Sequence, residues 1–312
     1  MPRNSRFAIP VLLFLVCHLP LSAQSAAGIP GVVAAGVEPQ LVQEGFVFTE
    51  GPVGAFDGGL YFSDVRANKI YHLDPSGKIT DVRDNTAGAN GLAFNASELY
   101  AVEGSGKLIS RGNASGRPVP ILENDARTML TAPNDLIFDA RGGIYFTDPP
   151  AGGPLPKVAG RAGKVYYAST SAGQPPYPFD DKITFPNGIA LSVDYRTLYV
   201  DDTAGENIWA FDVQLNTSVK NKHVFAKIPQ LTDGESLADG MCIDRDNRLY
   251  VTTGAGVQVF DKKGKFLGNI KLPRQPSNCA FAGPDKKTLY ITAREGLYSL
   301  KTLTAGPLRT GK

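Results

Sequence analysis

The sequence predicts an all-β fold, a six-bladed β-propeller with a metal site in its central channel. Two observations support this prediction. A strand-like segment containing a tyrosine recurs six times along the chain, and a carboxylate or amide residue precedes each of these tyrosines by nearly the same distance. Such self-similarity at a period of about 40 to 50 residues is typical of a repeated four-stranded unit.

The repeated segments each contain an aliphatic residue, a tyrosine and a further short stretch suited to a strand. Successive tyrosines are separated by 39, 45, 54, 51 and 40 residues, which fits one blade per repeat. No stretch of the chain beyond its first residues shows the sustained apolar spacing of a helix, so helix content should be minimal. The six segments are 58–64, 97–103, 142–148, 196–202, 247–253 and 287–293.

The residues 10 to 12 positions before the tyrosines are all carboxylates or amides. The first strand of each propeller blade lines the channel, so equivalent positions should form a ring. Oxygen ligands of this kind suit Ca²⁺, whereas zinc or iron would favour His or Cys. Each Asn or Asp alone is also an ordinary turn residue, but six in register favour a ring. The positions are Glu50, Asn90, Asn134, Asn187, Asp239 and Asn278.

Residues 1–23 have the layout of a secretory signal peptide: two arginines, an apolar stretch and a small-residue cleavage site. We therefore expect residues 24–312 to form a single propeller domain that is exported to the periplasm or the extracellular space, with no remaining membrane anchor. Residues 25–45 should supply a strand that closes the ring against the last blade. The Pro- and Gly-rich stretches 149–160 and 171–179 are predicted to be long loops.

The net charge of the mature chain argues against some classes of partner. The formal net charge of +2 falls to zero when the two arginines of the signal peptide are removed, so no nucleic-acid or anionic-membrane partner is predicted.

Cys242 and Cys279 remain in the mature chain. Both a disulfide and a pair of buried free thiols fit their sequence context. The oligomeric state is not determined by any of these features.

Six segments of the chain together carry a family resemblance. They are Thr-Glu-Gly-Pro at 49–52, Ala-Asn-Gly-Leu at 89–92, Ala-Pro-Asn-Asp-Leu at 132–136 with Tyr-Phe-Thr-Asp-Pro-Pro at 145–150, Phe-Pro-Asn-Gly-Ile-Ala-Leu at 185–191, and Ala-Asp-Gly-Met-Cys-Ile-Asp at 238–244. Because these segments occur in this order along the chain, it resembles the senescence-marker-protein, gluconolactonase and luciferin-regenerating-enzyme family over nearly its whole mature length.

The resemblance implies a calcium-dependent lactonase that acts on a small, sugar-type lactone. It implies Glu50, Asn187 and Asp239 as metal ligands, Asn134 as a fourth ligand or a substrate contact, and Asn90 as a substrate-binding group. Asn278 has no role that the resemblance transfers and is taken as structural. Calcium is the expected ion, with Zn²⁺, Mn²⁺ or Mg²⁺ as alternatives. Ala132 stands where some relatives carry a sugar-contacting arginine, a departure that puts the sugar preference in question.

The chemistry that follows is metal-assisted ester hydrolysis. The ion would polarise the lactone carbonyl and stabilise the oxyanion, and Asp239 would orient or activate the attacking water. Because a metal-bound carboxylate is a weak base, the role of Asp239 is expected to be mainly positional. Two alternatives remain open: a non-catalytic propeller that binds a ligand or partner around a structural calcium ion, and a related esterase or phosphotriesterase.

Other candidate groups are weaker. His72 and His223, the two histidines outside the signal peptide, lie away from the starts of the predicted inner strands, which disfavours a histidine-assisted mechanism. No Gly-x-Ser-x-Gly elbow of a serine hydrolase is present. The aspartates at strand ends are best explained as turn caps, although they could support the ring, Asp202 above all. They are Asp64, Asp148, Asp201 and Asp202.

Overall fold

The structure is a computed structural model that describes residues 27–112, 118–126, 128–153, 162–169, 175–232 and 236–309. The regular structure in these ranges is all β, and they contain no helix long and apolar enough to cross a membrane. The expected signal peptide, residues 1–23, lies outside the described residues.

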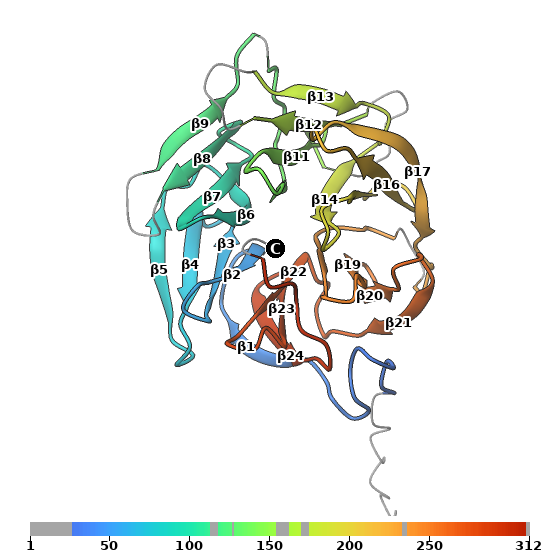
Figure 1. The fold of residues 1–312 in the computed structure, drawn as a ribbon. Helices are drawn as coiled ribbons and strands as arrows, with labels where there is room; N and C mark the ends of the chain where they lie inside the picture. The colour runs from blue at the N-terminus through green and yellow to red at the C-terminus, as the bar shows by residue number, and fades with distance from the viewer. Residues whose placement is uncertain are drawn as a thin grey trace, which may run out of the picture.

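The strands form six antiparallel sheets of four strands each (Figure 1). Five sheets are built from four consecutive strands, and the sixth takes one strand from the start of the chain. In order from the inner to the outer strand, the first blade contains β2 (Thr49–Gly54), β3 (Leu60–Asp64), β4 (Lys69–Leu73) and β5 (Ile79–Asp84), and the second contains β6 (Ala89–Asn95), β7 (Glu98–Glu103), β8 (Leu108–Gly112) and β9 (Val119–Glu123). The third blade contains β10 (Leu136–Phe138), β11 (Ile144–Asp148), β12 (Lys164–Ala168) and β13 (Tyr177–Asp180), and the fourth contains β14 (Pro186–Leu191), β15 (Thr197–Asp202), β16 (Asn207–Val213) and β17 (Val219–Lys227). The fifth blade contains β18 (Met241–Ile243), β19 (Leu249–Thr253), β20 (Gly256–Phe260) and β21 (Phe266–Ile270), and the sixth contains β22 (Asn278–Ala282), β23 (Thr288–Ala293), β24 (Gly296–Lys301) and β1 (Gln40–Glu44).

The sheets are arranged as the six blades of a propeller, as the sequence predicts (Figure 1). Each inner strand packs beside the inner strands of the two neighbouring blades, and β2 closes the circle by packing against β22. The predicted closing strand is β1, which pairs with β24 at the outer edge of the last blade. Pairing the two ends of the chain in one sheet joins the last blade to the first, and it leaves no gap in the circle of blades.

A separate apolar cluster fills each interface between neighbouring blades. The second strand of every blade is buried on both faces, which explains the recurring aliphatic and tyrosine residues in the sequence. Tyr145 and Tyr250, for example, are completely buried. Outer strands such as β5 and β17 are mostly exposed and therefore carry charged residues.

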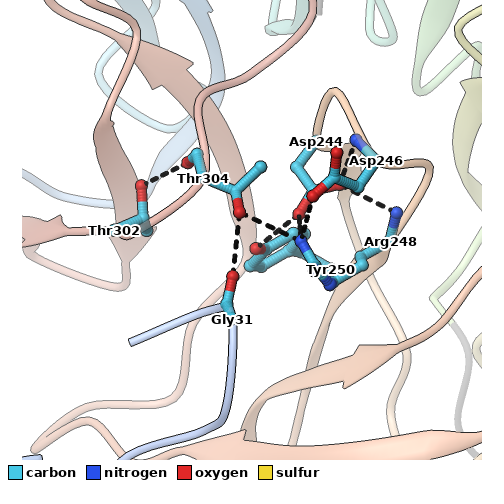
Figure 2. Close-up of polar contacts among 7 residues, drawn as sticks. All are labelled: Gly31, Asp244, Asp246, Arg248, Tyr250, Thr302 and Thr304. Carbon is cyan, nitrogen blue, oxygen red and sulfur yellow. Dashed lines mark hydrogen bonds and ion pairs between the residues drawn. The ribbon is translucent and has the colours of Figure 1, made fainter. Parts of the chain in front are cut away.

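Both ends of the described chain are tied to the last two blades (Figure 2). The hydroxyl of Thr304 donates a hydrogen bond to the carbonyl of Gly31 at 2.8 Å, and Nη1 of Arg248 donates to Oγ1 of Thr304 at 3.0 Å. The same Arg248 guanidinium pairs with Asp244 and Asp246 at 2.9 Å. This network joins residues that are far apart in the sequence.

One predicted loop contains a strand, and the two cysteines of the mature chain are not joined by a disulfide. Tyr177–Asp180 forms the outer strand β13 instead of part of a loop; an edge strand tolerates Pro178 because one side of it needs no ladder hydrogen bonds. Cys242 and Cys279 are buried and form no disulfide with each other; their sulfur atoms lie 3.3 Å apart, on the neighbouring inner strands β18 and β22.

Candidate metal centre

The six predicted ring residues all lie at the same end of the inner strands. Four of them are already part of a strand, whereas the sequence placed them just before it, because ladder pairing begins early: Glu50, for example, pairs with Ser63. The positions are the second residue of β2, β6 and β14 for Glu50, Asn90 and Asn187, the first residue of β22 for Asn278, and two residues before β10 and β18 for Asn134 and Asp239.

Glu50 is held in place by two hydrogen bonds at the junction of the first and last blades. Its Oε2 atom accepts one from the backbone N–H of Gly51 at 2.9 Å and one from Nδ2 of Asn278 at 3.1 Å. The Oδ1 atom of Asn278 in turn accepts from the backbone N–H of Cys279, which fixes the amide orientation. Glu50 is 3% exposed. A carboxylate so deeply buried needs a positive partner or a proton.

Asn187 presents an oxygen that has no hydrogen-bond partner among the described residues. Its Nδ2 donates to the hydroxyl of Thr203 at 3.0 Å, and that hydroxyl donates to the carbonyl of Ala238 at 2.6 Å. This chain points the nitrogen of the amide toward Thr203 and leaves Oδ1 buried and unsatisfied. A buried polar atom without a partner is costly, and a cation would satisfy it.

Asp239 lies among other negative charges. Burial raises the pKa of its carboxyl well above the ordinary value, and the nearby charge of Glu50 raises it further; a hydrogen bond from Asn187 acts in the opposite direction. The residue as a whole retains partial exposure. The residues Glu50, Asn187 and Asp239 are therefore brought together, although they come from three different blades.

Two further buried carboxylates, Asp135 and Asp201, belong to this acidic cluster. Burial and the charge of Asp239 raise the pKa of Asp201 well above its usual range, and Asp135 adds to the rise for both Asp239 and Asp201. Oδ1 of Asp201 accepts the backbone N–H of Gly188 at 3.1 Å, while Oδ2 is buried without a hydrogen-bond partner in the described chain. Sequence reasoning missed Asp135, although it follows Asn134 in the Pro-Asn-Asp motif.

Three strand-end aspartates hold the loops that carry ring residues. Asp202 accepts the backbone N–H groups of Thr184 and Phe185, at 3.3 and 2.9 Å, just before Asn187. The same arrangement precedes Glu50 and Asn134: Asp64 accepts from residues 47 and 48, and Asp148 from residues 131 and 132. Turn capping, expected for these aspartates, thus positions the ring itself.

The two amides assigned to substrate binding lie side by side. The backbone N–H of Gly91 donates to the carbonyl of Asn134 at 2.9 Å, which joins the Asn90 and Asn134 positions of the second and third blades. Both residues are partly exposed, and Oδ1 of Asn90 is buried without a hydrogen-bond partner among the described residues. These amides can therefore still bind a ligand.

The donor set fits a hard cation. It combines two carboxylates with amide oxygens, and an ion between Glu50 and Asp239 would offset the repulsion that raises the pKa of Asp239. The unsatisfied Oδ1 of Asn187 is a third oxygen donor at the same place. Within the described ranges, no three His, Cys, Asp or Glu side chains are arranged to hold a metal ion by themselves.

The histidines lie elsewhere. His72 is in the third strand of the first blade, stacked on Tyr61 with ring centroids 4.4 Å apart and with Nε2 3.1 Å from Asp57. These partners lie at the opposite end of β3 from Asp64 and the ring. His223 is on the outermost strand of the fourth blade, where Nδ1 lies 2.8 Å from the carbonyl of Asn221.

Comparison with known proteins identifies relatives along most of the chain. A gluconolactonase of Zymomonas mobilis is 29% identical over 294 residues, covering 86% of this chain and 82% of that protein. Lactonase drp35 of Staphylococcus saprophyticus is 31% identical over 227 residues, covering 69% of this chain and 67% of its own length.

Solved structures share the fold. A gluconolactonase of Xanthomonas campestris superimposes with a TM-score of 0.75 at 31% identity, covering 88% of this chain and 91% of that one. The calcium-binding protein regucalcin of Agrobacterium tumefaciens has a TM-score of 0.74 at 20% identity, covering 88% and 96%, and at that identity it supports the fold alone. Residues 48–295 match the family described as SMP-30/Gluconolactonase/LRE-like region, and the chain belongs to this family.

Proposed function

We propose that the protein is an exported, metal-dependent lactonase whose site is the ring around Glu50, Asn187 and Asp239. The observation that carries the proposal is the acidic cluster at the ring. There the charge of Glu50 helps to raise the pKa of Asp239, and Oδ1 of Asn187 has no hydrogen-bond partner among the residues that the structure describes. The similarity to gluconolactonases and lactonases supports the reaction class.

Calcium fits the donor set best, and Glu50, Asn187 and Asp239 would hold it, with Asn134 as a further ligand or substrate contact. Bound there, the ion would act as a Lewis acid toward the lactone carbonyl. Export rests on the layout of residues 1–23 and is tested by locating the processed protein outside the cytoplasm.

The chain's own residues supply orientation and proton handling. Asp239, partly exposed beside Glu50, would orient the attacking water. Asn90 and Asn134 would hydrogen-bond the lactone and fix its carbonyl toward the ring. The water oxygen bonds to the carbonyl carbon, the ring C–O bond breaks, and the leaving oxygen takes a proton. The product is a hydroxy acid, which releases one proton to the solution at neutral pH.

The test is pH-stat hydrolysis of a small panel of sugar and aliphatic lactones. We expect turnover that EDTA removes and added calcium restores. Glu50→Gln, Asn187→Ala and Asp239→Asn should each abolish metal binding or turnover, whereas Asp261→Asn, the same chemical change at a surface turn, should not. Stoichiometric calcium without turnover of any lactone would contradict the lactonase proposal and favour a binding propeller with a structural ion. Full activity of Asp239→Asn would contradict the assignment of the ring.

A further inference from the structure

Two arginines lie on one aromatic ring next to the proposed metal centre. The guanidinium carbons of Arg66 and Arg294 are 5.0 and 5.2 Å from the centroid of the Phe48 ring. The two guanidinium carbons are therefore at most about 10 Å apart. This is about the Debye length of a 0.1 M salt solution, so the two positive charges repel each other. Phe48 is two residues before Glu50, in the loop held by Asp64.

Neither arginine forms an ion pair with a described carboxylate. Arg294 donates a hydrogen bond to the neutral side chain of Gln275. The acidic residues closest to them in sequence have other partners. Asp64 accepts hydrogen bonds from backbone N–H groups, and Oε2 of Glu295 lies 3.7 Å from Nε of Arg274. The described residues thus leave both guanidinium groups without a carboxylate in an ion pair.

The position of Arg294 is fixed close to the ring. Its carbonyl accepts hydrogen bonds from the backbone N–H of Thr49 at 2.8 Å and from the Thr49 hydroxyl at 3.0 Å, so its backbone lies against the residue before Glu50.

The backbone of Arg294 adds a separate observation. Its φ angle is 53°, in the left-handed region, and it begins the short turn between β23 and β24. Glycine is favoured at such a position of a tight hairpin because it has no side-chain penalty. The chain carries an arginine there, and its side chain is directed onto Phe48 beside the proposed site.

We propose that Arg294 and Arg66 form an anion-binding subsite beside the metal centre, and that the natural substrate is an acidic lactone. Such a substrate has a lactone ring and, in addition, a carboxylate or phosphate group. Guanidinium groups bind both kinds of anion in a two-pronged geometry. This inference rests on the proposed lactonase function for the reaction and adds the class of substrate.

The test compares three lactones with the calcium-loaded protein: neutral glucono-δ-lactone, its 6-phosphate, and the carboxylate-bearing glucarolactone. We expect the wild-type protein to favour at least one acidic lactone in kcat/KM, and the phosphate and carboxylate arms distinguish the two sources of charge. Arg294→Gln should lower the acidic-to-neutral ratio of kcat/KM by about tenfold, the loss expected for one charge-assisted contact. High salt should lower the same ratio.

Arg66→Gln should act in the same direction and remains informative if Arg294→Gln disturbs the turn. Arg141→Gln is the matched control, since Arg141 is an exposed arginine in the turn before β11 of the third blade, at the strand ends away from the ring. A wild-type protein without preference for acidic lactones, or an unchanged ratio in both variants, would overturn the proposal.

A binding measurement separates this proposal from the lactonase proposal. Calorimetry with gluconate and with 6-phosphogluconate requires no turnover, and both acids offer the same carboxylate to the metal centre. A loss of affinity for 6-phosphogluconate alone in Arg294→Gln would support the anion subsite even if no lactone were hydrolysed. Efficient hydrolysis of lactones combined with equal affinities in wild type and variant would retain the lactonase and reject the subsite.

Discussion

Asn278 donates a hydrogen bond from Nδ2 to Oε2 of Glu50 at 3.1 Å, across the junction where the last blade meets the first. These two residues are 228 positions apart in the sequence. The contact gives a role to the one ring position for which the sequence offered none: Asn278 orients a carboxylate that we assign to the metal. Partners of this kind fix a ligand's direction and thereby influence metal affinity.

Asn278→Ala should therefore weaken calcium binding. Removal of an outer hydrogen-bond partner of a ligand typically lowers metal affinity about 10- to 100-fold. Titration calorimetry measures the affinity directly, and a thermal unfolding scan shows whether the blade junction is still formed. Asn95→Ala, at the far end of β6, is the matched control and should bind calcium as the wild type does. Equal affinity in both variants would show that Glu50 does not depend on Asn278.

The metal-free protein should lose stability as the pH rises. The pKa values of Asp239 and Asp201 are raised above the ordinary value of 3.8, chiefly by burial and then by neighbouring carboxylates. Above about pH 4 the unfolded chain has released these protons while the folded chain still binds them, so stability falls with pH until the raised pKa values are passed. Calcium binds the ionised form, so its stabilising effect should grow with pH.

Unfolding midpoints measured from pH 5 to pH 8, in EDTA and in excess calcium, check this prediction. The difference between the two series should widen toward pH 8. Parallel curves would indicate that the acidic cluster does not bind the ion.

Asp202→Ala should reduce both stability and metal affinity. Two backbone N–H groups, those of Thr184 and Phe185, lose their acceptor, at a cost of about 1–3 kcal/mol. Asn187 follows directly and would lose its fixed position. Asp194→Ala provides a control, because Asp194 also caps a turn of the same blade but at the opposite end. Denaturant titration and calcium calorimetry should show a stability loss in both variants and an affinity loss only in the first.

His72→Ala should leave turnover and calcium affinity unchanged. His72 stacks on Tyr61 and pairs with Asp57, both at the end of the first blade opposite the ring, so only a small stability loss of about 1 kcal/mol is expected. Steady-state kinetics with the best lactone found decides the question. Loss of activity with calcium still bound would reverse the argument against a histidine-assisted mechanism.

The blades and the ends of the inner strands could be predicted from the sequence because both leave a periodic pattern. A second strand buried on both faces requires an aliphatic residue and a tyrosine in every repeat, and the loop that enters each inner strand carries an amide or carboxylate. The closing strand was also predictable, and β1 lies within residues 25–45.

Contacts between blades were not predictable, because they depend on side-chain directions that no spacing encodes. Asn278 was taken as structural, yet it donates a hydrogen bond to Glu50. Asp135 was overlooked, yet its charge helps to raise the pKa of Asp239. Arg294 is a turn residue in the sequence and becomes notable only when the structure places it on Phe48, which is 246 positions earlier in the chain. Edge strands such as β13 are equally hard to predict, since exposed edges tolerate proline.

The C-terminal segment should contribute to stability through Arg309. The Arg309 guanidinium donates to the carbonyls of Leu191 and Ser192, where the inner strand of the fourth blade ends, and lies 4.8 Å from the centroid of the Tyr195 ring. Asn187 is at the other end of that strand, so the segment crosses the propeller at the end away from the ring. Figure 1 shows the chain running from β24 toward the centre.

Arg309→Ala should lower the free energy of unfolding by about 1–3 kcal/mol, because two hydrogen bonds from a charged donor and one cation–π contact are lost. Arg111→Ala, which removes a solvent-exposed ion pair with Glu98, is the matched control and should cost less than about 1 kcal/mol. Urea titrations of both variants measure the difference. Calcium affinity should not change in either variant, since neither side chain reaches the ring. Equal urea midpoints for the two would show that Arg309 does not anchor the segment, whereas a loss of calcium affinity in Arg309→Ala would mean that the two ends of the channel are coupled.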